Sequence, residues 1–241
     1  MVRFNIKTME IKDLKLNISK IIHEAPDVKT FEFETTLNYE AGQFVMMGLE
    51  NNPKNQNSYS FSSSPTEDTS KFTIKINPQG GKLSPKLDKL KEGDQVQLKG
   101  PYGRFVYEDH PSKDIVFIAA GTGVAPLRSM IKYVIDKKLE KNLSLLFSVR
   151  TPEHILYKNE LDSWEKEGKL KTHLTITRPE ESDEQWNEDI GRIDKEFLEK
   201  YLKNKEALIY ICGPPKMVDN TVSLLQKIGV KRENLKYEKW S

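Results

Sequence analysis

The stretch from Ile115 to Val134, IVFIAAGTGVAPLRSMIKYV, indicates how the second half of the chain folds. It begins with an apolar run that ends at Ala120, continues into a glycine turn, and from Pro126 has the spacing of a helix. Proline suits the first turn of a helix, where a backbone N–H has no partner in any case. The stretch therefore predicts one unit of a strand followed by a helix.

The turn inside this unit, Gly121-Thr122-Gly123, has the chemistry of a phosphate-binding loop. Its bare backbone lets a pyrophosphate approach the N–H groups at the start of the helix. Pro126 departs from the dinucleotide fingerprint, because it stands where a third small residue would lie. Ordinary strand-to-helix geometry explains such a turn equally well, so on its own it is a weak signal.

The rest of the second half repeats the same alternation. Apolar segments that predict buried strands are separated by segments with helical spacing, which favours a parallel sheet covered by helices on both faces. The expected strands are Leu143 to Val149, His173 to Thr177 and Leu208 to Cys212, and the expected helices are Leu156 to Trp164, Lys195 to Leu202 and Pro215 to Ile228.

The first half has a different texture, with short segments rich in β-branched and aromatic residues between glycine, proline and asparagine. This pattern predicts an antiparallel β-barrel or sandwich, with one short helix after Leu83 that ends near Glu92-Gly93-Asp94. We expect the two domains to span residues 1–109 and 110–241. The predicted strands include Val28 to Glu34, Gln43 to Leu49, Phe72 to Ile76 and Gln95 to Leu98.

Composition excludes several classes of protein and site. With 38 Lys and Arg against 36 Asp and Glu, the net charge of +2 gives no support to nucleic-acid binding. Cys212 is the only cysteine, which rules out an internal disulfide and a multi-cysteine metal site and suits a reducing cytoplasm. The four histidines stand singly, so no metal site is expected. No apolar run reaches the ~20 residues that span a bilayer, so we expect no membrane span.

A second strand end, Ile211 to Met217, repeats a glycine turn with Gly213 and Pro214 before a helix. Parallel sheets bind ligands outside their carboxyl edge, so the two turns are expected to face one ligand. Cys212, beside the second turn, also fits the simpler role of a small buried hydrophobe.

Two motifs in the first half suit a planar ring with a polar edge. The run from Asn57 to Pro65 alternates aromatic and hydroxyl residues, among them Tyr59, Ser60, Phe61 and Ser62, although a serine-rich strand entering a loop is an alternative. A glycine turn with a hydroxyl at a helix start then offers a second pyrophosphate seat, or an ordinary helix cap. It consists of Gly81, Lys82, Leu83 and Ser84.

Joined in this order, the motifs resemble the ferredoxin-NADP reductase superfamily, in which a flavin-binding β-barrel precedes an NAD(P)-binding α/β domain. The resemblance runs from about Leu14 to Trp240. Each motif is weak alone, but their joint order and spacing are specific. They are Ala41 to Val45, Tyr59-Ser60, Gly81 to Ser84, Gly100 to Phe105, Gly121 to Pro126, Cys212 to Pro215 and Tyr237 to Trp240.

The resemblance implies hydride transfer from NADPH or NADH to bound FAD, with FMN as an alternative, and then electron transfer to an acceptor such as ferredoxin or flavodoxin. It implies that Tyr59 stacks on the flavin and that Ser60 bonds near its N5 atom. Thr122 and Cys212 would border the nicotinamide, and Trp240 would cover the other flavin face and move aside during turnover. Ser60, Cys212 and Trp240 are thus the expected catalytic residues. The cofactor site is also expected to include Phe61, Ser62, Lys75, Ile76, Gly81, Lys82, Leu83, Ser84, Gly121, Gly123, Pro126, Gly213, Pro214 and Met217.

One departure from the family pattern concerns the flavin pyrophosphate. The family usually has arginine two residues before the stacking tyrosine, and this chain has Asn57. A charge-assisted contact is missing unless Lys54, Lys82 or another cation replaces it. Two other readings stay open: a reductase that uses free flavin as its substrate, and a non-catalytic subunit of a larger redox complex.

Arginines after neighbouring elements favour NADPH over NADH. Arg150 ends one expected strand, Thr177-Arg178 resembles the Ser-Arg pair that holds the 2′-phosphate in relatives, and Arg192 follows Gly191. A guanidinium fork suits phosphate oxygens, so three of them could converge on one dianion. The acidic run near Glu180 could instead repel a phosphate.

Overall fold

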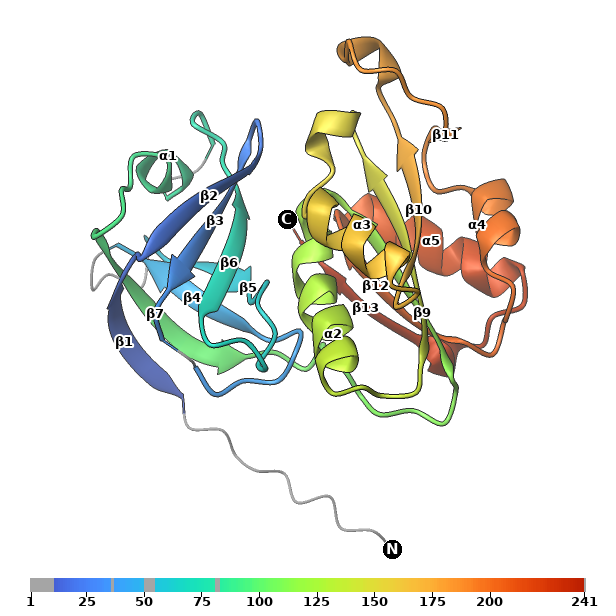
Figure 1. The fold of residues 1–241 in the computed structure, drawn as a ribbon, viewed down its shortest axis with the longest axis horizontal. Helices are drawn as coiled ribbons and strands as arrows, with labels where there is room; N and C mark the ends of the chain where they lie inside the picture. The colour runs from blue at the N-terminus through green and yellow to red at the C-terminus, as the bar shows by residue number, and fades with distance from the viewer. Residues whose placement is uncertain (1–10, 36, 50–54, 81–82, 241) are drawn as a thin grey trace, which may run out of the picture.

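A computed structural model describes residues 11–35, 37–49, 55–80 and 83–240. It has two parts side by side, an antiparallel part built from the first half of the chain and an α/β part built from the second (Figure 1). The expected fold class is confirmed. The division at residues 109 and 110 stays a prediction; the last strand of the first part ends at Tyr102 and the first strand of the second begins at Asp114.

The antiparallel part contains two sheets. One has the order β1-β7-β4-β5, formed by Lys12–Asn17, Gln95–Tyr102, Phe44–Gly48 and Asn57–Ser60. The other has the order β2-β3-β6, formed by Lys20–Ala25, Val28–Phe33 and Ser70–Lys75. A bridge between Phe61 and Phe72 joins the two sheets just beyond β5. Apolar side chains from both sheets meet in one core, which includes Phe31, Phe33, Met47, Phe72 and Leu98.

The helix predicted after Leu83 is much shorter than expected. Only α1, Ser84–Leu87, is helical, and the chain then turns well before Glu92. Gly93 has φ +91°, and the backbone N–H of Lys91 donates to the Asp94 carboxylate at 2.8 Å. This turn leads directly into β7, so the helix has no room to continue.

The α/β part has one parallel sheet of six strands in the order β11-β10-β9-β8-β12-β13. Side chains of β8 alternate between two cores: Phe117 packs with α2 and α3, and Ile118 packs with α4 and α5. Helices therefore cover both faces, as predicted (Figure 1). The strands are β8 Asp114–Ala120, β9 Asn142–Val149, β10 Lys171–Ile176, β11 Asp189–Ile190, β12 Leu208–Gly213 and β13 Leu235–Lys239. The helices are α2 Val124–Asp136, α3 Lys158–Lys166, α4 Lys195–Tyr201 and α5 Pro215–Lys227.

The segment that resembled an aromatic tail is mostly a strand. In β13, Glu238 lies opposite Cys212 of β12, and Trp240 follows directly after the strand. The tail is thereby fixed to the edge of the parallel sheet. In the part of the chain that the structure describes, no helix is long and apolar enough to cross a membrane.

Candidate functional site

The two glycine turns meet at the carboxyl edge of the parallel sheet. The first turn, η2 (Gly121–Gly123), follows β8, and the second follows β12. A Cβ on Gly123 would lie 2.3 Å from the carbonyl oxygen of Cys212, so only glycine allows this approach of two backbones. Gly121 has φ +53° and is exposed, as is Pro214, while Pro126 is buried in the first turn of α2. This edge thus presents bare backbone to a ligand, the arrangement that suits a pyrophosphate.

The first turn also touches the other half of the molecule. Besides β8, β9 and β12, η2 lies against β6 of the antiparallel part. Thr122, at its centre, is half-buried. A dinucleotide on this turn would therefore end at the junction of the two parts.

Cys212 and Trp240 are in direct contact beside the second turn. The indole Nε1 of Trp240 donates to the Cys212 sulfur at 2.7 Å, and the backbone N–H of Trp240 donates to the Gly213 carbonyl at 3.0 Å. Burial raises the pKa of the Cys212 thiol, although the Trp240 bond opposes this. The thiol is buried and its pKa is raised, so it is poorly suited to act as a nucleophile.

Glu238 is a residue that the sequence interpretation missed. Its Oε2 atom is buried and has no hydrogen-bond partner among the described residues, and burial raises its pKa to about 7. Because side chains alternate along a strand, Glu238 lies on the same face as Trp240. The signal was present in the order Glu238-Lys239-Trp240, where an acid stands two residues from the aromatic ring. A carboxyl group with such a pKa can hold or release a proton near neutral pH.

Strand β5 brings Tyr59 and Ser60 to the edge of the first sheet. The Tyr59 hydroxyl accepts from Asn57 Nδ2 at 3.5 Å, and burial raises its pKa more than this bond lowers it. Ser60 is 5 % exposed, and its hydroxyl has no partner among the described residues. An unpaired buried hydroxyl is costly, so a ligand that bonds to Ser60 would remove that cost. The residues present therefore fit a flavin, with a ring for stacking beside a free hydroxyl.

Several predicted cofactor residues have other partners in the fold. Phe61 is fully buried and stacks on Tyr39 with ring centroids 3.7 Å apart, and Leu83 lies in the same core. Their side chains are used in packing, so only their backbone is left for a cofactor. The Ser62 carbonyl accepts a hydrogen bond from Arg128 Nη1, and the Ser84 hydroxyl accepts one from the N–H of Asn77.

Two predicted residues, Gly81 and Lys82, lie outside the described residues, as does Lys54. Met217 is half-buried, and its sulfur accepts from Thr221 Oγ1 at 3.4 Å. Its methyl carbon would lie 2.5 Å from a Cβ on Gly213, so it packs beneath the second turn.

Asp27 lies close to two cations and a histidine at the junction. It pairs with Arg150, with Lys75 at 3.4 Å and with His154 at 3.7 Å. Burial raises the pKa of Asp27, but the charges of Lys75 and Arg150 outweigh it and lower the pKa overall. The backbone N–H of Ile76 also donates to the Asp27 carbonyl at 2.7 Å. The Arg150 side chain is thus occupied by a carboxylate.

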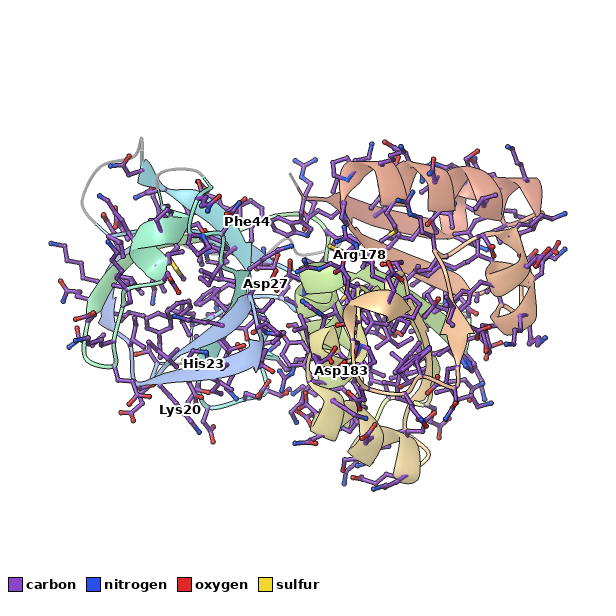
Figure 2. All side chains as sticks on the ribbon, turned by 90° about the horizontal axis from the view of Figure 1, so that it is seen from above. Lys20, His23, Asp27, Phe44, Arg178 and Asp183 are labelled. Carbon is purple, nitrogen blue, oxygen red and sulfur yellow. The ribbon has the colours of Figure 1, made fainter. Side chains whose placement is uncertain are left out.

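The other two arginines expected to bind the dinucleotide, Arg178 and Arg192, are more exposed than Arg150. Arg178 is half exposed and bonds to Glu181 at 2.9 Å, and its backbone N–H donates to the Arg150 carbonyl at 2.8 Å. Figure 2 shows Arg178 on the α/β side of the junction and Asp27 on the antiparallel side. Arg192 is exposed in the loop after β11. The structure brings Arg150 and Arg178 to one edge of the sheet.

Comparison with known families matches both halves of the chain. Residues 15–107 match the family described as the oxidoreductase FAD-binding domain, and residues 117–223 match the oxidoreductase NAD-binding domain. This chain belongs to the ferredoxin-NADP reductase-like superfamily of flavoprotein reductases. Its cofactors are accordingly FAD and a nicotinamide dinucleotide.

Individual relatives are similar to this chain over most of its length. The flavohemoprotein of Bacillus subtilis (strain 168) is 29% identical over 83% of this chain and 51% of the relative. The glycine betaine monooxygenase reductase subunit of Chromohalobacter salexigens is 30% identical over 87% of this chain and 59% of the relative. The chain spans between half and three fifths of the length of these relatives.

Solved structures share the fold of the reductase. The cytochrome b5 reductase domain of Ulva prolifera nitrate reductase has a TM-score of 0.82 and 25% identity, covering 94% of this chain and 97% of that one. A ferredoxin NADP+ reductase from Neisseria gonorrhoeae with bound FAD and NADP has a TM-score of 0.81 and 23% identity, covering 95% and 98%.

Proposed function

We propose that this protein oxidises NADPH, in preference to NADH, by hydride transfer to bound FAD and then passes electrons to an acceptor protein. The observation that carries the proposal is the contact of η2 with β6, because it joins the dinucleotide turn of one half to the flavin half. We also propose that the domains divide at residues 109 and 110.

The named residues hold and shield the reacting groups. FAD supplies the chemistry of accepting a hydride and releasing single electrons. Tyr59 stacks on the flavin ring, the free Ser60 hydroxyl bonds its polar edge, and Trp240 excludes water from the opposite face. Gly121, Thr122, Gly123, Gly213 and Pro214 receive the dinucleotide at the sheet edge.

Buried Cys212 and partly buried Glu238 complete the proposed site. Cys212, held by Trp240, forms the wall beside the nicotinamide. Glu238, whose burial raises its pKa to about 7, holds a proton close to that wall. We propose that this carboxyl group supplies or accepts protons as electrons pass through the site.

Selection of NADPH falls to three arginines. Arg178 and Arg192 are exposed. The backbone N–H of Arg178 donates to the Arg150 carbonyl, which keeps these two residues side by side. We propose that they bind the 2′-phosphate, with Arg150 exchanging Asp27 and Arg178 exchanging Glu181 for the ligand.

The acceptor is proposed to be a ferredoxin or a flavodoxin in the cytoplasm, which suits a chain with one cysteine. Free flavin is a second candidate acceptor, because exposed Asn57 replaces the family arginine and offers no charge to hold the pyrophosphate. A purified protein that is colourless and saturates with micromolar flavin would favour the second candidate.

The experiment that tests the proposal is steady-state kinetics with NADPH and NADH on the FAD-loaded protein. A higher specificity constant for NADPH supports the assignment. Equal constants would remove the phosphate site from the proposal, and no flavin reduction with either dinucleotide would indicate a non-catalytic subunit.

A further inference from the structure

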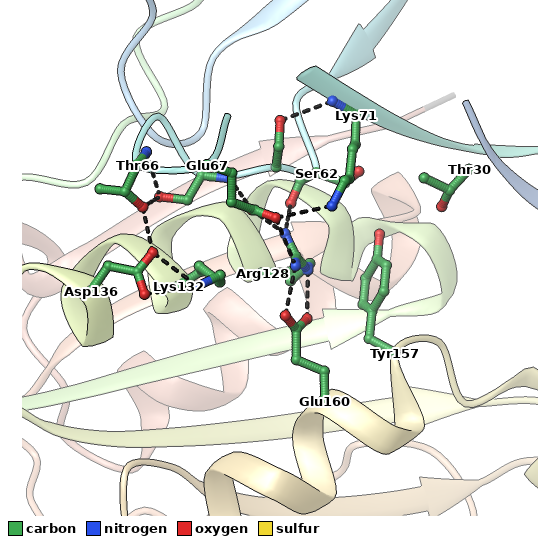
Figure 3. Close-up of polar contacts among 12 residues, drawn as sticks. Thr30, Ser62, Thr66, Glu67, Lys71, Arg128, Lys132, Asp136, Tyr157 and Glu160 are labelled. Carbon is green, nitrogen blue, oxygen red and sulfur yellow. Dashed lines mark hydrogen bonds and ion pairs between the residues drawn. The ribbon is translucent and has the colours of Figure 1, made fainter. Parts of the chain in front are cut away.

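A buried arginine joins the two halves of the molecule beside the proposed site. Arg128, in α2, is 6 % exposed, and all three of its guanidinium nitrogens are bonded (Figure 3). Its Nη1 donates to the Ser62 carbonyl at 2.7 Å and to Glu67 at 2.8 Å, both in the antiparallel part. Its Nε and Nη2 each donate to Glu160 of α3 at 2.6 Å. Arg128 therefore links α2 to α3 in its own half and to Ser62 and Glu67 in the other half.

Glu67 is built to receive this arginine. Its carboxylate also accepts from the Ser64 N–H at 2.7 Å and from Lys71 Nζ at 3.1 Å. Burial opposes its ionisation, but the bonds and charge of Arg128 outweigh that effect and lower its pKa to about 2. Glu67 is thus an anion under all ordinary conditions. Ser64 and Lys71, both on the flavin side, bind its carboxylate in addition to Arg128.

The position of Arg128 connects the two cofactor motifs. Ser62 lies two residues after Ser60, and its own N–H is bonded to Lys71 of β6 at 2.8 Å. On the other side, α2 begins at Val124, directly after the turn Gly121–Gly123. One side chain therefore spans from the strand that would stack the flavin to the helix that would hold the nicotinamide.

The surrounding contacts give this link a fixed geometry. The guanidinium lies over the Tyr157 ring at 5.4 Å, and the Tyr157 hydroxyl donates to Thr73 of β6 at 2.5 Å. At the far end of α2, Thr66 donates to Asp136 at 2.5 Å. That second contact is exposed, so it is suited to serve as a comparison for the buried one.

We propose that Arg128 is a positioning residue, which sets the distance between the nicotinamide and the flavin through its bonds to Ser62 and Glu67. This inference rests on the proposed function. Hydride transfer depends steeply on the approach of the reacting atoms, and a misplacement of about 1 Å can cost on the order of 10²-fold in rate. Loosening the link should therefore slow hydride transfer without weakening the binding of either cofactor.

The test uses Glu67→Gln, which removes the charge on the flavin side and leaves Arg128 bound to Glu160. The matched control is Asp136→Ala, which removes a second polar contact between α2 and the flavin part, the exposed bond to Thr66. In anaerobic rapid mixing of the FAD-loaded proteins, we expect Glu67→Gln to lower the limiting rate of flavin reduction roughly 10- to 100-fold. Dissociation constants for FAD and for the oxidised dinucleotide should stay within about threefold of the parent, and Asp136→Ala should keep the parent rate.

A second readout follows the junction without any hydride chemistry. Spin labels at exposed positions 20 and 203, one in each half, report the distance between the halves; buried Cys212 is not expected to react. We expect a broader distance distribution in Glu67→Gln and the parent distribution in Asp136→Ala. A parent-like rate and distribution in Glu67→Gln, or a loss confined to thermal stability, would overturn the positioning role. If the parent protein is not reduced at all, the proposed function fails, and the distance measurement still decides whether Arg128 fixes the two halves.

Discussion

Arginines of two kinds lie at the junction, and they differ in what surrounds them. Arg128 is enclosed by Glu67, Glu160 and a backbone carbonyl, and very little of it meets solvent. Arg178 is half exposed and bonds to one equally exposed carboxylate, that of Glu181. A buried charge depends on its partners, whereas an exposed pair contributes little to stability. Burial therefore distinguishes an arginine that links parts of the fold from an arginine that is able to exchange its partner for a ligand.

The largest effect is expected from Arg128→Met. Removing the guanidinium leaves Glu67 and Glu160 close together without the cation between them, and breaking a buried pair in this way costs about 3–5 kcal/mol. The free energy of unfolding, followed by tryptophan fluorescence in urea, measures the loss. For Arg178→Ala we expect a change within about 0.5 kcal/mol. Similar losses in the two variants would erase the distinction between the two kinds of arginine.

The exposed arginine is expected to matter for substrate choice instead. A hydrogen bond to a charged group contributes about 1.5–3 kcal/mol, so Arg178→Ala should lower the specificity constant for NADPH roughly 10- to 100-fold. The constant for NADH should remain near that of the parent, because NADH has no 2′-phosphate. An equal loss with both dinucleotides would defeat the assignment.

The substitution Asn57→Arg introduces a new arginine on the flavin side. Asn57 is exposed at the start of β5, where the family has its pyrophosphate contact. The new charge should slow FAD loss on dialysis, with an affinity gain that corresponds to about 1.5–3 kcal/mol. Unchanged FAD retention would place Asn57 away from the phosphates or show that another cation already serves there.

Trp240→Ala tests the flavin face that Trp240 is proposed to cover. Without the indole, the nicotinamide no longer competes for the stacking surface, so we expect its binding to tighten roughly 2- to 13-fold, from about 0.5–1.5 kcal/mol for an aromatic pair. The variant should also make Cys212 reactive towards a thiol reagent, since Trp240 donates to its sulfur. Unchanged affinity together with an unreactive thiol would place Trp240 outside the site.

A separate effect is the pH dependence caused by Glu238. Its pKa in the folded protein is about 7, above the ordinary value of 4.5. The folded state therefore binds more protons than the unfolded state between these values, so stability falls as pH rises from 4.5 to 7. Glu238→Gln should flatten this part of the stability curve. A curve identical to that of the parent would show that Glu238 titrates normally.

The sequence predicted the elements that depend on local pattern. The glycine turns, the apolar strands and the Tyr59-Ser60 motif follow from neighbouring residues, and both the parallel sheet and its covering helices are confirmed. The helix after Leu83 was wrong in length, because the backbone at Gly93 and Asp94 is bonded to Ile18, which is far away in the sequence.

The links across the junction were beyond the sequence for a physical reason. Glu67 and Arg128 are 61 positions apart, and Asp27 and Arg150 are 123 apart. Each residue alone has the pattern of an ordinary charged side chain, and only the packing of the two halves pairs them. Glu238 was missed for a related reason: the order Glu238-Lys239-Trp240 places an acid two residues from the aromatic ring, but only the pairing of β13 with β12 buries its Oε2 atom.

Hydride transfer from a nicotinamide to the flavin of this protein can be followed in a single absorption spectrum. The purified protein is loaded with FAD, freed of excess flavin, and mixed with NADPH without oxygen. The account predicts that the visible absorbance of the bound FAD bleaches and returns on admission of air. Bound FAD whose spectrum is unchanged by NADPH and by NADH would contradict it.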